Sequence, residues 1–278
     1  MQNNLDFINL PGMALLYRIL VTYQTHREGA LMKRAFLCAV ICLTACITAS
    51  AQDAAYYKAI QKDAKVTIEP KQFKQMEEDA FRNYTQPDKY ELLASTFANT
   101  SERAWAVIYG EVFCSLSPNP DRINRMGALV YQSYEKSLLS QDGKVSVDLT
   151  ENAQITRNQA PFESQFEMSF LMGTLPLGGN LTPLSIQKLT KIRENQLSLW
   201  TQKKFPLNDL MRRQQAIIAA GQFEAYNYWL FQSARPDEFK EWISQHQTQF
   251  DDWLNWQSKN KFILQSADLQ RLHVMHGW

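Results

Sequence analysis

The stretch Pro118–Leu138, PNPDRINRMGALVYQSYEKSL, is the part of the sequence that most clearly indicates the fold. Proline does not continue a helix, so Pro118-Asn119-Pro120 predicts the end of one helix, and Asp121 is a suitable N-cap for the next. The apolar residues that follow recur every three or four positions, which is the spacing of one helical face. They are Ile123, Met126, Leu129, Val130, Tyr134 and Leu138. We therefore predict a helix that buries this face.

The same pattern continues on both sides of this stretch. A proline or a capping residue stands where most of the helices should begin. The predicted starts are Pro70, Ser101, Pro161, Thr182-Pro183 and Pro206, and three shorter helices are expected over 223–231, 236–245 and 249–257. The Ser101 helix should bury a stripe that includes Trp105 and Phe113.

Two short segments alternate apolar and polar residues, which is typical of a strand. They are residues 65–69 and 144–149, the second of which follows a predicted turn at Asp142-Gly143. The two segments could pair as a small two-stranded β-ribbon. The predicted fold class is thus mostly α, as an irregular multi-helix bundle or an array of helical hairpins, with this ribbon added. No fixed repeat period is visible.

Residues 32–51 have the features of a secretory signal peptide. The positive Met32-Lys33-Arg34 precedes an apolar and small-residue run over 35–51, and Ala49-Ser50-Ala51 fits the A-x-A cleavage rule. We predict cleavage after Ala51 and a periplasmic or secreted protein of a bacterial envelope. An uncleaved membrane anchor is an alternative, because the apolar run is only just long enough to span a bilayer.

The segment Leu43-Thr44-Ala45-Cys46 resembles the sequence that precedes the acylated cysteine of bacterial lipoproteins. This resemblance implies lipidation of Cys46 and attachment of the mature protein to the envelope by a lipid anchor, as an alternative to soluble export.

Residues 1–31 fit poorly in front of a signal peptide, because Asp6, Pro11 and Glu28 interrupt them. We therefore expect translation to begin at Met32, with residues 1–31 a non-native upstream extension. The alternative is an amphipathic extension around Leu15, Leu16, Ile19 and Leu20.

Residues 52–278 are expected to form a single helical domain with a loose C-terminal tail from about residue 263. Without the first 51 residues, the basic residues fall from 29 to 25 and the acidic residues from 28 to 26, so the net charge is about −1. This balance offers no basic surface for nucleic acid. Cys114 is then the one remaining cysteine, which excludes an internal disulfide.

Glu163-Ser164-Gln165-Phe166 resembles the catalytic glutamate region of lytic transglycosylases, which would imply that Glu163 acts as a general acid. That family continues with Gly-Leu-Met-Gln, whereas this chain reads FLMGTL over 170–175. We therefore interpret Glu163 as a helix-surface or capping carboxylate. No catalytic residue is predicted.

Other reactive residues also favour structural roles. Cys114 could be a nucleophile assisted by Glu111, but it follows two apolar residues on a helical face and is better read as a small buried hydrophobe. His273 and His276 lack further ligands, so no metal site is predicted. The loop 173–180 lacks a nucleotide-binding glycine pattern, so no cofactor is predicted.

Aromatic residues crowd the segment 226–256. Most should belong to the core, yet neighbouring aromatics of one helix cannot all share a face. We expect Trp229, Trp242 and Trp253 to pack together, and Tyr228 and Trp256 to face solvent and bind an envelope protein or a glycan. The predicted function is therefore non-catalytic binding in the envelope. The alternative is a hydrolase that acts on envelope polymers.

Overall fold

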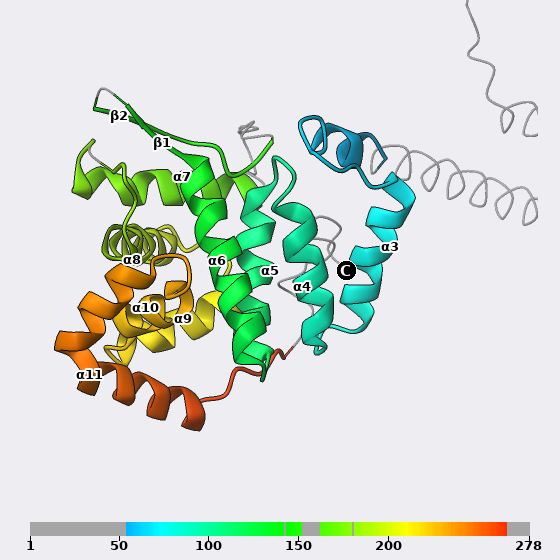
Figure 1. Ribbon diagram of the computed structural model, residues 1–278. Coiled ribbons are helices and arrows are strands. Elements are labelled where there is room, and N and C mark those ends of the chain that lie inside the picture. Colours follow the sequence, from blue (N-terminus) through cyan, green and yellow to red (C-terminus); the bar gives the residue numbers. More distant parts are fainter. Residues whose placement is uncertain (1–53, 142, 152–161, 180, 266–278) are drawn as a thin grey trace, which may run out of the picture. The chain divides into compact units, whose positions relative to one another are not determined.

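The computed structural model describes residues 54–141, 143–151, 162–179 and 181–265, and the regular structure in these residues is almost entirely helical (Figure 1). Residues 54–59 are helical. The other helices are α3 Pro70–Arg82, α4 Pro87–Phe97, α5 Arg103–Leu116, α6 Pro120–Ser137, α7 Phe162–Thr174, the 3-10 helix η1 Leu175–Leu177, α8 Ile186–Gln202, α9 Asp209–Ala219, α10 Phe223–Phe231 and α11 Pro236–Lys259. The strands are β1 Leu138–Gln141 and β2 Lys144–Val147. The mostly α fold class is confirmed.

Helix α5 lies at the centre of the packing. It stands between α4 and α6 in Figure 1, and α7 and α9 also contact it. Every residue from Ala104 to Cys114 is buried. The predicted stripe with Trp105 and Phe113 is therefore buried as expected, but so is the opposite face. A helix covered on all sides tolerates apolar and small residues around its whole circumference.

The remaining helices pack around this centre as an irregular bundle. Helices α3 to α6 stand side by side, each in contact with the next (Figure 1). Helix α7 packs along α8, and α10 contacts α6, α8, α9 and α11. Within the described residues, no helix combines the length and the apolar character that a membrane span requires.

Several helix starts differ from the predictions, because the residue that caps each helix was misidentified. Asn119, not Asp121, is the N-cap of α6, and its side chain accepts the backbone amide hydrogen of Arg122. Ser185 caps α8 in the same way, three residues after the predicted start. Asn208 caps α9, although Pro206 was the expected start. In each case the cap is a side chain that accepts the amide of the third following residue.

Two further starts were not found correctly. Helix α5 begins after Glu102 rather than after Ser101, whose backbone amide donates to the carbonyl of Ile60. Helix α4 has no counterpart among the predicted helices, although Pro87 stands at its first position and its buried residues have helical spacing.

The small β-ribbon exists, but one of its predicted strands is wrong. Strand β2 pairs antiparallel with β1, which directly precedes it, and the register places Leu138 opposite Val147. Residues 65–69 form no strand. The hairpin turns at Gly143, whose φ of 72° suits glycine. A partner separated by a tight turn pairs at a lower entropic cost than one about eighty residues away.

The C-terminal helices agree closely with their predicted ranges. Helix α10 has the predicted bounds, and Gly221 ends the turn before it with a φ of 69°. Helix α11 covers both predicted segments and is interrupted by non-helical backbone angles at His246. The chain stays packed beyond this helix, because Leu264 is buried and the amide of Gln265 donates to Asp209. Residues 264 and 265 thus keep contacts with the domain, and the rest of the tail predicted from about residue 263 lies outside the described residues.

Several predictions concern residues outside the described ranges. They are the upstream extension 1–31, the signal peptide 32–51 with the lipidation site Cys46, the helix start at Pro161, and His273 and His276.

Candidate functional site

A buried ion pair joins four helices at the centre of the domain. The Glu111 carboxylate on α5 accepts hydrogen bonds at Oε2 from Arg193 Nη2 at 2.5 Å, Gln214 Nε2 at 2.8 Å and Tyr226 Oη at 2.7 Å. These partners come from α8, α9 and α10 respectively. Arg193 also donates to the side-chain oxygen of Asn227. The charges therefore compensate each other within the core.

Aromatic rings surround the Arg193 guanidinium. It lies 5.4–5.9 Å from the ring centroids of Tyr134, Phe223, Tyr226 and Phe231. Burial is the largest single effect and would lower the pKa of Arg193, but the Glu111 carboxylate, Tyr134 and Tyr226 together outweigh it, so the pKa is raised. Burial and the same carboxylate raise the pKa of Tyr226 well above its usual value. Arg193 is therefore charged and Tyr226 protonated at neutral pH.

The cavity beside this ion pair is too small for a substrate. Its volume is about 10 Å³, and Glu111, Arg193, Asn208 and Gln214 are among its lining residues. A volume of this size holds about one water molecule. We therefore assign a structural role to the Glu111–Arg193 pair.

Cys114 is buried, as predicted, with 1% of its surface exposed. Burial, with a smaller effect of Glu111, raises the pKa of its thiol well above the usual value. Because Glu111 binds Arg193 and does not activate the thiol, the geometry gives no support to a nucleophilic role.

Tyr228 does not face solvent, contrary to the prediction. It is 5% exposed, and its ring stacks on Trp242 with the centroids 4.3 Å apart and an angle of 8° between the planes. The His246 ring also stacks on Trp242, with the two ring centroids 5.0 Å apart. Helix α10 is covered on both sides by other helices, so both of its faces belong to the core.

Trp256 and the predicted packed set are placed differently. Trp256 is half-buried and stacks on Trp253 with a centroid distance of 5.7 Å, so only part of its ring is accessible. Trp242 and Trp253 are buried, as expected, whereas Trp229 is half-buried. Trp256 therefore packs against Trp253 and is only partly exposed, although it was predicted to face solvent.

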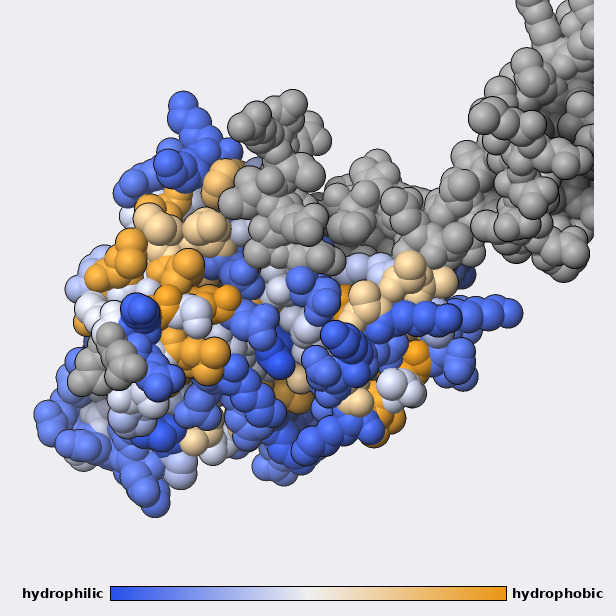
Figure 2. Space-filling model, turned by 90° about the horizontal axis from the view of Figure 1, so that it is seen from above, coloured by the Kyte–Doolittle hydropathy of each residue, from blue (hydrophilic) through white to orange (hydrophobic). Residues whose placement is uncertain are grey.

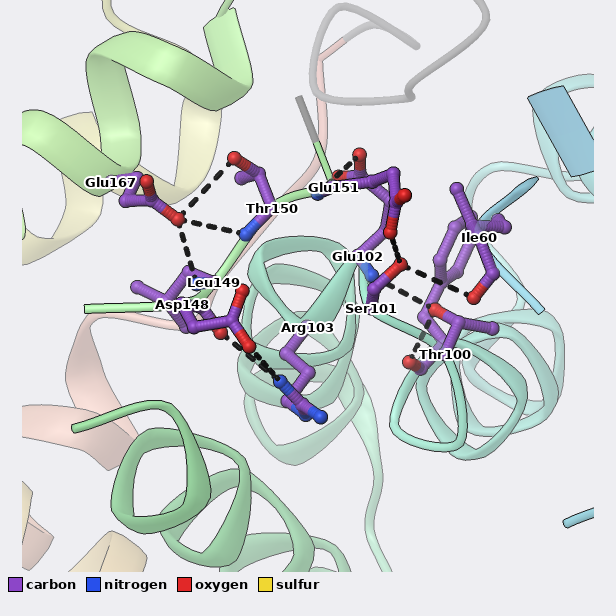
Figure 3. Close-up of polar contacts among 11 residues, drawn as sticks. Ile60, Thr100, Ser101, Glu102, Arg103, Asp148, Leu149, Thr150, Glu151 and Glu167 are labelled. Carbon is purple, nitrogen blue, oxygen red and sulfur yellow. Dashed lines mark hydrogen bonds and ion pairs between the residues drawn. The ribbon is translucent and has the colours of Figure 1, made fainter. Parts of the chain in front are cut away.

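A second group of polar contacts ties the start of α5 and the middle of α7 to the segment 148–151 (Figure 3). Glu167 Oε2 accepts the backbone amides of Leu149 at 2.7 Å and Thr150 at 2.9 Å. Glu102 Oε1 accepts the amide of Glu151 at 3.1 Å. These carboxylates satisfy backbone donors of a segment that lacks regular structure, which is a structural use of acidic residues.

Glu163 is buried in the first turn of α7, which corrects its interpretation as a helix-surface residue. It is 6% exposed, and its Oε1 accepts a hydrogen bond from Trp105 Nε1 at 3.0 Å. Its Oε2 is buried and has no hydrogen-bond partner among the described residues. The position at a helix N-terminus favours a carboxylate electrostatically. A buried carboxyl group beside a tryptophan is also an environment used for general acids.

Sequence reasoning missed an apolar stripe on the surface of α7 and η1. We define the α7 stripe as Met168, Met172 and Leu175, which are 43%, 42% and 61% exposed. Figure 2 shows apolar surface gathered on the side of the molecule that carries α7 and the β1–β2 hairpin. The spacing of four and then three residues places the stripe on one helical face, and this spacing was the available signal.

No metal site is present among the described residues, since none of their His, Cys, Asp and Glu side chains form a suitable cluster. Comparison of the chain with protein families, curated proteins and solved structures finds no match. Its function therefore has to be inferred from its own geometry.

Proposed function

We propose that this chain is an exported protein of a bacterial envelope that acts by binding another protein through the α7 stripe. The exposure of Met168, Met172 and Leu175 on one face is the observation that carries the proposal. Surface methionines are flexible and polarizable, so they adapt to apolar partners. Contiguous apolar surface is typical of protein–protein contact sites.

A protein partner is favoured over a glycan because of where the aromatic residues lie. Glycan sites usually present exposed aromatic rings, whereas Tyr228, Trp242 and Trp253 are buried in this structure. The α7 stripe contains no aromatic residue. Export follows from the predicted signal peptide over 32–51, and a lipid anchor on Cys46 is the alternative form of the mature protein.

The experiment compares the wild type with a Met168→Glu/Met172→Glu variant in capture from envelope extracts. The matched control is Val66→Glu/Leu92→Glu, which introduces the same two negative charges at apolar residues that are 72% and 51% exposed elsewhere on the surface. We expect the α7 variant to lose a partner that the wild type and the control both retain, with melting temperatures unchanged. Equal capture by all three proteins would refute the proposal.

A hydrolase is the second candidate, favoured by the buried Glu163 with its unpartnered Oε2. In that case Glu163 would protonate the leaving-group oxygen of an envelope polymer. Purified wild-type protein would then release soluble fragments from peptidoglycan, and Glu163→Gln would abolish this release. Absence of release by the wild type would leave binding as the function.

A further inference from the structure

Arg213 of α9 lies close to two aromatic rings next to the end of α11. Its guanidinium carbon is 5.5 Å from the ring centroid of Trp256 and 5.4 Å from that of Phe262. Its Nη1 donates to the backbone carbonyl of Asn260 at 2.8 Å. Helix α9, helix α11 and the segment after it thus fix the position of one guanidinium group.

This guanidinium has no carboxylate partner among the described residues. The two arginines nearest to Arg213 in the sequence both form ion pairs, Arg193 with Glu111 and Arg212 with Asp209. The Nε of Arg213 is buried, and no described residue forms a hydrogen bond with it. Burial also lowers the pKa of Arg213, which is the effect expected when a cation leaves water uncompensated.

The free donors of Arg213 match one class of ligand. A guanidinium carries five N–H donors in a planar fork. The Nε–H of Arg213 is buried and one Nη1 hydrogen binds Asn260, which leaves the second hydrogen of Nη1 and the two hydrogens of Nη2 for an anion. Carboxylate and phosphate oxygens fit this fork with two parallel hydrogen bonds. The side chain is half-buried, so an anion can approach it from solvent.

We propose that Arg213, packed against Trp256 and Phe262 and bonded to the carbonyl of Asn260, is a binding site for an oxyanion, either a carboxylate or a phosphate group. The two rings restrict the guanidinium to one orientation, which reduces the entropy lost on binding. The rings also exclude water from part of the guanidinium surface, which strengthens its attraction to a bound anion. The site is separate from the α7 stripe and does not depend on the function proposed for that surface.

The experiment is calorimetric titration of the full chain with inorganic phosphate and, in a second series, with acetate, both at constant ionic strength. We expect saturable binding of at least one anion, which also identifies the preferred oxyanion. Arg213→Gln should weaken binding at least about tenfold, because hydrogen bonds to a charged group are lost. Arg213→Lys should weaken it as well, because lysine keeps the charge but lacks the fork.

The matched control is Arg212→Gln, since Arg212 is the neighbouring arginine and already pairs with Asp209. This variant should bind like the wild type. The bound anion should also raise the melting temperature of the wild type and of Arg212→Gln, but not that of Arg213→Gln. Absence of saturable binding of both anions, or equal binding by Arg213→Gln, would overturn the proposal. Melting of each variant without anion verifies that it is folded.

Discussion

Glu111 Oε2 and Arg193 Nη2 lie 2.5 Å apart, and both side chains are at least 98% buried. The two residues are 82 positions apart in the sequence, on α5 and α8. Their ion pair therefore joins helices from the two halves of the domain. The packing of α5 against α8 should depend on both charges being present. Such a pair contributes to stability only while both partners are present.

Removal of either charge should destabilise the fold strongly. Glu111→Gln and Arg193→Met should each lower the free energy of unfolding by about 3–5 kcal/mol, because each leaves its partner buried without compensation. The double variant Glu111→Leu/Arg193→Met should cost clearly less than the two single changes together. Urea unfolding measures the free energy of unfolding of these three variants.

Lys191→Met, which removes an exposed ion pair with Glu194, serves as the control and should cost less than about 1 kcal/mol. Additive costs in the double variant would contradict this account.

The thiol of Cys114 should make stability fall in alkali. Its pKa is raised in the folded protein, whereas the unfolded thiol ionises near its ordinary value of 9.0. Above that pH the unfolded chain releases a proton that the native state retains, so the free energy of unfolding decreases by about 1.4 kcal/mol per pH unit. Below it, this contribution is fully present.

The alkaline loss of stability can be tested by comparing Cys114→Ala with the wild type under reducing conditions. At neutral pH the variant should be less stable by about 1–2 kcal/mol, because a small buried side chain is truncated. Between pH 9 and the folded pKa, the difference should shrink, since the variant lacks the ionising group. The native thiol should also react slowly with a maleimide at neutral pH. Parallel pH profiles of the two proteins would argue against a raised pKa.

Local signals in the sequence predicted the fold better than the site. Helix α10 was located with both ends, because Gly221 and the aromatic run mark them locally. The burial of Arg193 could not be predicted, since an arginine in a helical pattern gives no sign of a carboxylate partner 82 residues away. The exposure of Tyr228 was predicted wrongly because periodicity assumes one buried face, whereas α10 is covered on both sides. Tertiary contacts of this kind are absent from a local pattern.

Tyr228 should behave as a core residue and Trp256 as a boundary residue. Tyr228→Ala and Trp242→Ala should each cost about 3–5 kcal/mol, because each removes one ring of a closely stacked pair. Trp256→Ala should cost about 1–2 kcal/mol, since its ring is only half-buried. Urea unfolding provides the comparison. A smaller cost for Tyr228→Ala than for Trp256→Ala would contradict the burial of Tyr228.

The mature N-terminus should be Gln52. The positive residues at Met32-Lys33-Arg34, the apolar run after them and Ala49-Ser50-Ala51 together define the expected cleavage point. N-terminal sequencing of protein purified from the envelope measures it directly. Incorporation of labelled palmitate at Cys46 would instead identify the lipid-anchored form, and Cys46→Ser should abolish that label.

Gly127 sets the distance between α6 and α10. A Cβ atom at this position would collide with the backbone carbonyl oxygen of Leu230, whereas a Cβ atom at Gly110 would collide with the side chain of Val130. A side chain can change its rotamer, but a helical backbone can only move with its whole helix. We therefore expect Gly127→Ala to cost about 3 kcal/mol or more, and Gly110→Ala about 1–3 kcal/mol, despite the higher helix propensity of alanine in both. Urea unfolding of the two variants, with near-ultraviolet circular dichroism to follow the packing of aromatic rings on α10, tests this difference. If Gly127→Ala is the milder change, α10 does not approach α6 as closely as the structure shows.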